Sequence, residues 1–484
     1  MCIQIAKATP FSGAPKIQMP SLYGIPTGKE ILYRIPVTGE RPIKIKVSGL
    51  PRGLRFENGM LTGSVAKDKE FTITVKAENK QGSCEKEVLC KVGQDVMLLT
   101  PLMGYTTWNA YRNRVTQQMV EDIADKLAET GIRDYGYNYI NVDSGWQDTY
   151  GGEFDAIMPN PKFPDMKGMC DKLHAQGYLC GIYSTPMLTA WGFPDADEPK
   201  SAGIEHLDYF PGCTTGEPDE LCCDVMGGIG VEHKEENNVR QWDAWGFDYL
   251  KYDWRICDPP TAHIMKKALL ASKRAWAYCV TLRANVIYGH YWSKYCTSWR
   301  DNVDTMDNWA NVSARLDGAD QWKKIVKPGH FYDLDMLEIG AMEWNGGEKS
   351  RLTDEEQLFA YTVHSFFPSP VQLSCRLEKL TEFEFNMICN DEMIRISQDA
   401  LCDYPTLVKE YKDTKSKMYK RTLENGDTAI AVFNMGDEAL EDHLLLLEDK
   451  RILDVWTKED LGVSCNLEFT VAPHCVRVFR ISAQ

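Results

Sequence analysis

The pattern of apolar and polar positions changes twice along the chain and divides it into three regions. In the first, residues 8–95, apolar side chains alternate with polar ones, most clearly over residues 71–77, as in a half-buried strand. Asn-Gly at residues 58–59 and Gln-Gly at residues 81–82 predict turns on either side of it. These features predict a small β-sandwich.

The second region, residues 96–402, alternates short apolar segments with amphipathic ones. This alternation predicts a parallel sheet, and its length and repeat number favour a (β/α)8 TIM barrel. No Gly-x-Gly-x-x-Gly loop follows the first predicted strand, which argues against a dinucleotide-binding open sheet. The predicted strands are residues 137–143, 178–184, 247–253, 286–291, 302–306 and 331–336, with a further one near 371–374. The predicted helices are residues 117–129, 166–176, 261–277 and 354–364.

The third region, residues 403–484, returns to short strand-like segments. Asn425-Gly426 predicts a hairpin turn within it. The segments are residues 428–433, 444–447, 452–456 and 475–481. We therefore predict a multidomain protein, in which an α/β barrel lies between an N-terminal β-sandwich and a C-terminal antiparallel β-sandwich.

Polar side chains recur where the predicted barrel strands end. One such residue is unremarkable, because an isolated Asp is common in loops and helix caps. The strands of a barrel all end on one face, so a repeated set predicts a single pocket there. The set comprises Asp143 and Ser144, Tyr183, Lys251 and Asp253, Arg300 and Asp304, and Asp333 and Asp335.

Two of these carboxylates suit the hydrolysis of a glycosidic bond. Lys251 and Asp253 are two residues apart and share one strand face, so the lysine is expected to keep Asp253 ionised with a low pKa, as a nucleophile requires. Asp304 would donate a proton to the leaving oxygen. Arg300 opposes protonation of Asp304, whereas burial and the charge of Asp253 favour it, and the sequence leaves this balance open.

Composition narrows the class of partner. The net charge of −16 argues against nucleic acid and against an anionic membrane, but is compatible with a neutral sugar. No apolar run is long enough for a membrane span, and no apolar signal segment opens the sequence. We therefore expect a cytoplasmic protein, or an exported one if the sequence has been trimmed. The sixteen cysteines lack disulfide-framework spacing and are expected to be reduced.

Several motifs in the second region resemble glycoside hydrolase family 27, the α-galactosidases and α-N-acetylgalactosaminidases. They occur in family order from residue 100 to residue 399. The motifs lie at residues 100–108 (TPLMGYTTW), 141–146 (NVDSGW), 181–183 (GIY), 249–253 (YLKYD), 299–304 (WRDNVD), 328–336 (PGHFYDLDM) and 394–399 (IRISQD).

The resemblance implies a retaining mechanism with Asp253 as nucleophile and Asp304 as acid/base. It implies that Trp108 forms an aromatic wall of the sugar pocket. It also implies an α-galactoside-type oligosaccharide or glycoconjugate as partner, with neither cofactor nor metal. The positions that would bind sugar hydroxyls are Asp143, Tyr183, Lys251, Arg300 and Asp335.

The sequence departs from the family pattern at three places. Ser144 stands where the family has a second carboxylate that contacts the sugar, and this weakens the expected grip on a galactose 6-hydroxyl. The segment 288–292 matches neither the galactose-type nor the N-acetylgalactosamine-type pattern at the 2-position. His290 and Tyr291 would fill that role, and a structural histidine is the alternative. A family cysteine pair is absent near Ala190 and residues 254–256.

Other possibilities stay open at this stage. The substrate would otherwise be an α-N-acetylgalactosaminide or a β-L-arabinopyranoside, and a non-catalytic sugar-binding protein or homo-oligomer is allowed. Residues 49–79 resemble the immunoglobulin-like domains attached to bacterial hydrolases, which implies an accessory module. A segment with His206, Cys213, Cys222, Cys223 and His233 lacks a recognised zinc spacing, so a cysteine-bearing surface loop is the favoured interpretation.

Overall fold

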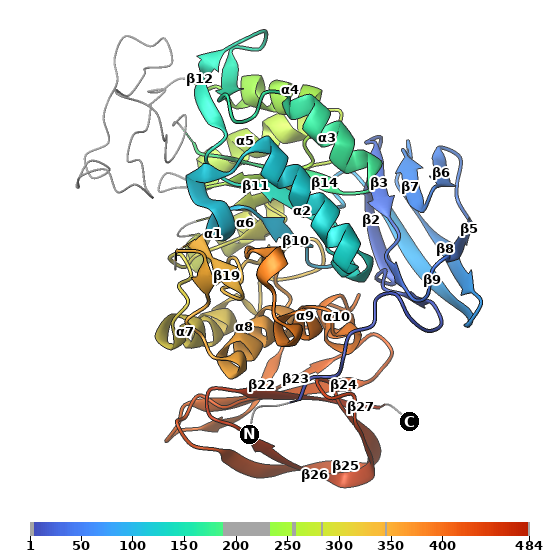
Figure 1. Ribbon diagram of the computed structural model, residues 1–484, viewed down its shortest axis with the longest axis vertical. Helices are drawn as coiled ribbons and strands as arrows, with labels where there is room; N and C mark the ends of the chain where they lie inside the picture. Colours follow the sequence, from blue (N-terminus) through green and yellow to red (C-terminus); the bar gives the residue numbers. More distant parts are fainter. Residues whose placement is uncertain (1–3, 187–232, 254–257, 282–283, 344–345, 483–484) are drawn as a thin grey trace, which may run out of the picture.

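The computed structural model describes residues 4–186, 233–253, 258–281, 284–343 and 346–482. They form an N-terminal β unit and a C-terminal β unit that pack against two different sides of a central barrel (Figure 1). No helix within these ranges combines the length and the apolar character that crossing a membrane requires. The cysteines in the same ranges are all free thiols, in line with the expectation from their spacing.

The N-terminal unit contains two sheets. One has the strand order β2-β9-β8-β5 and the other the order β3-β7-β6, and Ile73, Val75 and Val88 are among the fully buried side chains between them. The alternation noted over residues 71–77 belongs to β8, which pairs with β9 along its whole length. The strands are β1 (Lys16–Ile17), β2 (Leu22–Pro26), β3 (Ile31–Arg34), β4 (Val37–Thr38), β5 (Lys44–Ser48), β6 (Leu54–Glu57), β7 (Met60–Gly63), β8 (Lys69–Asn79) and β9 (Gly82–Gly93).

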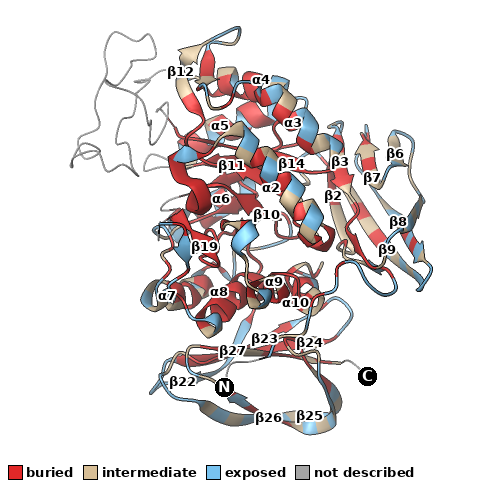
Figure 2. Cartoon of the chain, viewed as in Figure 1, coloured by how far each residue is buried: buried red, intermediate tan, exposed pale blue. Residues whose placement is uncertain are grey.

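The central unit is an eight-stranded parallel sheet with the order β18-β17-β16-β15-β14-β11-β10-β21. A parallel bridge between Leu337 and Leu373 links its two ends, so the sheet curls into a barrel. Every strand is buried along its length, which Figure 2 shows as a red interior. The strands are β10 (Met103–Thr106), β11 (Tyr139–Val142), β14 (Leu179–Ser184), β15 (Tyr249–Tyr252), β16 (Ala277–Val280), β17 (Ser298–Trp299), β18 (Phe331–Tyr332) and β21 (Val371–Leu373).

Helices follow the barrel strands and cover the outside of the sheet (Figure 1). Their starts carry local signals: the Thr116 side chain caps α2, and Thr353 and Glu356 form a capping box at α8. The helices are α1 (Trp108–Tyr111), α2 (Gln117–Thr130), α3 (Met166–Ala175), α4 (Glu235–Trp245), α5 (Pro259–Ala271), α6 (Gly289–Tyr295), α7 (Trp309–Ala319), α8 (Asp354–Phe366), α9 (Glu382–Ile388) and α10 (Asp391–Ser397). Two hairpins, β12 (Gln147–Gly151) with β13 (Ala156–Pro159) and β19 (Ala341–Met342) with β20 (Glu348–Lys349), complete this unit.

Three predicted elements of the barrel are wrong. Residues 286–291 are not a strand: the Asn285 side chain accepts a hydrogen bond from the Ile287 amide, and a 3-10 helix followed by α6 begins there. Residues 302–306 are not a strand either, because strand six is the two-residue β17 that precedes them. The predicted helix 261–277 ends at residue 271, and its last position opens the fifth strand, β16.

The C-terminal unit is one six-stranded antiparallel sheet with the order β22-β23-β24-β27-β25-β26. The Asn425-Gly426 turn connects β23 to β24 as predicted, with Gly426 at φ +86°. β25 pairs with β27 only at its end, so the β25–β26 pair folds away from the other strands (Figure 1). The strands are β22 (Thr406–Tyr411), β23 (Ser416–Thr422), β24 (Thr428–Phe433), β25 (Leu440–Asp454), β26 (Asp460–Val471) and β27 (Val476–Ile481).

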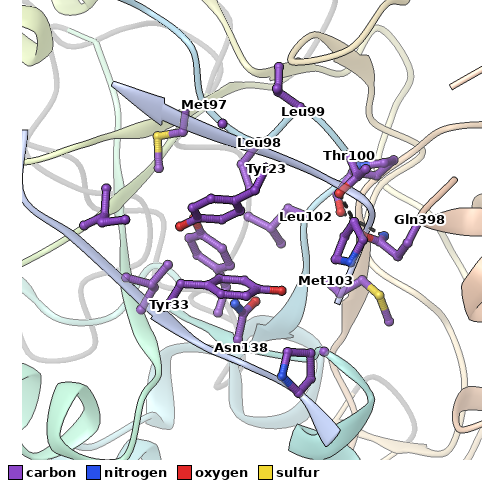
Figure 3. A pocket seen from close by; sticks show the side chains of 18 of the residues that line it. Tyr23, Tyr33, Met97, Leu98, Leu99, Thr100, Leu102, Met103, Asn138 and Gln398 are labelled. Atoms are coloured by element: carbon purple, nitrogen blue, oxygen red, sulfur yellow. Dashed lines mark hydrogen bonds between the residues drawn. The ribbon is translucent and has the colours of Figure 1, made fainter. Parts of the chain in front are cut away.

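A pocket lies between the N-terminal unit and the barrel. Tyr23 and Tyr33 line it from the N-terminal unit, and Leu102 and Asn138 line it from the starts of barrel strands (Figure 3). Parallel strands all start at one end of a barrel, so this pocket is at the opposite end from the predicted strand-end carboxylates. It belongs to the domain junction and is not the candidate catalytic site.

The same junction contains a buried acidic anchor. Asp134 of the barrel is 2% exposed, its Oδ1 is 3.0 Å from Arg34 Nη2, and its Oδ2 contacts Arg41. Both arginines come from the N-terminal unit, so this carboxylate ties the two units together.

Replacing Asp134 with alanine is expected to destabilise the protein by about 1–3 kcal/mol, because two charge-assisted hydrogen bonds are lost while both arginines keep partial access to water. Chemical denaturation followed by intrinsic fluorescence measures the effect. Lys126→Ala, which removes an exposed pair with Glu129, is the control and should change stability by less than about 0.5 kcal/mol. A similar small change for Asp134→Ala would contradict the anchor.

Candidate active site

The carboxyl ends of the barrel strands bring most of the predicted site residues together. Tyr183 and Lys251 lie opposite each other in the paired strands β14 and β15. Asp143 directly follows β11, and Arg300 directly follows β17. Asp335 lies just beyond β18. These elements are adjacent in the sheet, so their polar ends form one cluster.

Lys251 forms one half of the cluster with Asp143. Its Nζ is 2.7 Å from Asp143 Oδ2, and both side chains are buried. Burial lowers the pKa of Lys251, but the negative charges of Asp143 and Asp253 outweigh burial and hold that pKa above its ordinary value. The sequence predicted that Lys251 acts on Asp253, whereas the close ion pair of Lys251 is with Asp143.

Asp253 is oriented by hydroxyl groups. The Tyr183 hydroxyl donates to its Oδ2 at 3.0 Å, and the Thr281 hydroxyl donates to its Oδ1. Its side chain retains 14% exposure. Thr281 immediately follows β16 and was missed in the sequence, because the fifth strand was assigned to residues 286–291 instead. A carboxylate held at both oxygens and still accessible has the geometry that nucleophilic attack requires.

Arg300 forms the other half of the cluster. This fully buried guanidinium places Nη2 at 2.8 Å from Asp304 Oδ1 and 4.0 Å from Asp253 Oδ1, and Nη1 contacts Asp335. Because one Nη2 atom is near both, the Asp253 and Asp304 oxygens are at most about 7 Å apart. Retaining glycosidases separate their two carboxyl groups by about 5–5.5 Å, and this bound is compatible with that separation.

Asp304 has the electrostatics of a proton donor. Its side chain is 58% exposed at the mouth of the cluster, but the surrounding protein removes much of the water behind it. This desolvation raises the pKa of Asp304, Arg300 opposes the rise, and the charges of Asp335 and Asp253 add to it. The net direction of the Asp304 pKa is upward, as a proton donor in this position requires.

The pKa of Asp335 is shifted in the opposite direction from that of Asp304. Burial by itself would raise its pKa, but Arg300 and Lys251 hold it well below the usual range. Its backbone has φ +80°, a conformation that costs a non-glycine residue energy and that is common at functional sites. The Thr305 amide donates to its carboxylate at 2.8 Å, and its own amide donates to Asp333 Oδ1 at 2.8 Å.

Trp108 and Ser144 lie next to this cluster. Trp108 opens the single-turn helix α1 directly beyond β10 and is 9% exposed. The Thr107 hydroxyl, one residue earlier, accepts a hydrogen bond from the Asp143 amide at 3.0 Å. Ser144 is buried, and its amide donates to Asp143 Oδ1 at 2.8 Å. Both residues are therefore attached to the Asp143 side of the site.

His290 and Tyr291 are not joined to the cluster by any contact among the described residues. They lie on α6 with exposed side chains, and their rings pack at a centroid distance of 3.9 Å. The residue that follows the fifth strand and reaches Asp253 is Thr281. The assignment of His290 and Tyr291 to the sugar 2-position stays a prediction.

A separate group of potential metal ligands lies at the other end of the barrel. His174, Cys180 and Asp248 place their ligand atoms within 4.8 Å of one another. Burial lowers the pKa of His174, but its hydrogen bond to Asp248 outweighs burial and raises that pKa to about 10. Arg274 also contacts Asp248. His174, Asp248 and Arg274 therefore form an ion-pair cluster at this end of the barrel. The segment with Cys213 and Cys222 lies outside the described residues.

A parallel barrel whose strand ends bring two carboxylates close together offers the pair of groups that glycoside hydrolysis requires. The family model described as "Alpha galactosidase A" matches residues 100–205 and 216–399, and the one described as "Alpha galactosidase C-terminal beta sandwich domain" matches residues 413–481. The chain belongs to the alpha galactosidase A family.

Individual relatives are similar over most of this chain. Alpha-galactosidase 2 of Arabidopsis thaliana is 26% identical over 430 residues, which cover 85% of this chain and 96% of that protein. A Bacteroides fragilis structure provisionally named as an alpha-galactosidase/melibiase is 26% identical, with a TM-score of 0.83, and covers 98% of this chain and 99% of its own. A family 27 β-L-arabinopyranosidase from Geobacillus stearothermophilus shares the fold, with 22% identity, a TM-score of 0.67 and coverage of 79% and 96%.

Proposed function

We propose that the protein is a retaining exo-α-glycosidase that releases terminal α-D-galactosyl residues. The observation that carries this proposal is the Arg300 guanidinium, which holds Asp304 at 2.8 Å and Asp253 at 4.0 Å. Family membership and relatives named as α-galactosidases support the choice of sugar.

Two steps account for the reaction. Asp253 attacks the anomeric carbon, the glycosidic C–O bond breaks, and Asp304 gives its proton to the leaving oxygen. The second step reverses the roles: the Asp304 carboxylate takes a proton from water, and the resulting nucleophile displaces Asp253 from the anomeric carbon. The raised pKa of Asp304 and the oriented, accessible carboxylate of Asp253 fit these roles.

The remaining cluster would bind the sugar. Lys251 and Arg300 supply fixed donors, and Asp143 and Asp335 supply acceptors, for a ring whose hydroxyls point in several directions. Trp108 would cover its apolar face. The N-terminal unit, with its two facing sheets, would be an immunoglobulin-like accessory domain without a part in this chemistry.

The serine at position 144 supports a β-L-arabinopyranoside as a second candidate substrate. Its short side chain provides no carboxylate for the 6-hydroxyl of galactose, and arabinopyranose lacks that carbon while sharing the other hydroxyls.

Turnover of three p-nitrophenyl glycosides tests the proposal: the α-D-galactoside, the α-N-acetylgalactosaminide and the β-L-arabinopyranoside. The expected result is the highest kcat/KM on the α-D-galactoside. A higher kcat/KM on one of the other two glycosides would change the proposed sugar but not the proposed mechanism. Absence of turnover on all three glycosides would overturn the proposed function.

A further inference from the structure

A buried glutamate beside the candidate active site has no role in the steps above. Glu338 lies three residues beyond Asp335 and is 2% exposed. Its Oε1 accepts a hydrogen bond of 2.6 Å from Asn109 Nδ2. Its Oε2 is buried and has no partner in the part of the chain that the structure describes.

The surroundings disfavour a charge on this side chain. A buried carboxylate without a cation is costly, and no ion pair to Glu338 occurs among the described residues. Burial first, and then the nearby charges of Asp335 and Asp307, raise the pKa of Glu338 above its ordinary range, while Asn109 and Arg315 act weakly in the other direction. Burial and the neighbouring carboxylates therefore both favour the uncharged form of this side chain.

Asn109, the hydrogen-bond partner of Glu338, lies on helix α1, which also contains Trp108. Asn109 follows Trp108 in α1, which is a single turn whose N-cap residue, Thr107, makes no side-chain capping bond. A helix this short is not stable by itself. External hydrogen bonds hold it: the Asn109 amide donates to Ser374 Oγ at 2.9 Å, and its side chain donates to Glu338.

The hydrogen bond thus joins two walls of the site. One end lies next to Trp108, and the other lies on the segment that contains Asp335, the partner of Arg300. We propose that Glu338, through its hydrogen bond with Asn109, is a positioning residue that fixes Trp108 relative to Asp335 and thereby sets the affinity for the sugar. This inference rests on the proposed function, since it assigns Trp108 to the sugar.

Glu338→Leu removes the acceptor, and Glu338→Gln keeps an uncharged side chain of the same shape with an acceptor oxygen. The leucine variant is expected to raise KM for the p-nitrophenyl α-galactoside about tenfold with a smaller change in kcat, because a wall contacts the sugar equally in the ground and transition states. The glutamine variant should stay within about twofold of the wild type. A leucine variant with unchanged KM, or a glutamine variant equally impaired, would overturn the proposal.

Two further measurements separate positioning from general destabilisation. Asp134→Ala, which loses stability at the domain junction, should leave KM unchanged. Asn109→Leu should reproduce the KM increase, and the double variant with Glu338→Leu should add nothing to it, because both changes remove one hydrogen bond. Additive effects on KM would contradict the role of the Asn109–Glu338 hydrogen bond. If Glu338→Leu does not fold, Asn109→Leu alone provides the test.

Hydrogen exchange gives a readout that does not depend on turnover. Backbone amides of α1 should exchange faster in Glu338→Leu and at the wild-type rate in Glu338→Gln. Unchanged exchange in the leucine variant would overturn the inference even in a protein without activity. Absence of wild-type turnover on all three glycosides, with faster exchange in α1, would instead count against the proposed function alone.

Discussion

Replacing Asp253 with asparagine is expected to abolish turnover of the p-nitrophenyl α-galactoside, lowering kcat by about 10³-fold or more. The amide cannot form the covalent bond to the anomeric carbon, and the good p-nitrophenolate leaving group does not remove the need for a nucleophile. One of the Tyr183 and Thr281 hydroxyls still donates to the amide oxygen, and the other can turn to accept from the amide NH2, so the variant should fold and bind sugar normally. Steady-state kinetics and denaturation on the same preparations measure both.

A carboxylate of the same active-site loop supplies the control for this variant. Asp301 follows Arg300, and its oxygens accept hydrogen bonds from the Tyr332 hydroxyl at 2.5 Å and from Trp322 Nε1 at 3.1 Å. It points into packing and away from the Arg300 contacts, so Asp301→Asn should keep kcat within a few-fold. Wild-type turnover by Asp253→Asn would mean that another residue attacks the sugar, and the two-carboxylate mechanism would fall.

Strand-end patterns in the sequence directly predicted the part of this site that lies around β11, β14 and β15. The segments around β11, β14 and β15 have long apolar runs that end in polar residues, and Asp143, Tyr183 and Lys251 lie where those runs place them. Such runs are readable because a barrel strand buried on both faces is apolar throughout. The apolar runs do not show which side chains contact each other. Lys251 of β15 forms an ion pair with Asp143, which follows β11, and only the order of the strands in the folded sheet determines this contact.

Around β16 and β17 the strand bounds lacked a usable local signal, although Arg300 and Asp304 were among the predicted site residues. β17 has two residues, which are too few to show any periodicity, and the sixth strand was therefore predicted at residues 302–306 beyond it. Val303 in that segment is 60% exposed, because the segment is a loop whose Thr305 amide bonds Asp335. Thr281 was not predicted because the fifth strand was placed at residues 286–291 and not at β16, and Glu338 lies in a loop of mixed polarity where no local pattern predicts burial.

Replacing Asp304 with asparagine is expected to have an effect that depends on the leaving group. General acid catalysis typically contributes about 10²–10⁴-fold, and it matters most when the departing oxygen is a poor leaving group. An alkyl α-galactoside should therefore lose about 10³-fold or more in kcat/KM, whereas the p-nitrophenyl substrate, whose phenolate leaves without a proton, should lose much less in the same parameter. Both substrates are assayed with the same enzyme, so a folding defect would lower the two rates equally and would be recognised.

The pH profile of the wild type carries the same test further. The protonated form of Asp304 is the active one in the first step, so activity is retained below its pKa and lost as the pH rises through that pKa. Desolvation raises this pKa, which moves the loss of activity to higher pH than an ordinary aspartate would allow. Asp304→Asn has no proton to lose, so its residual kcat/KM on the p-nitrophenyl substrate should lack this alkaline decline. If the decline persisted in the variant, a group other than Asp304 would be the acid, and the assignment of Asp304 would fall.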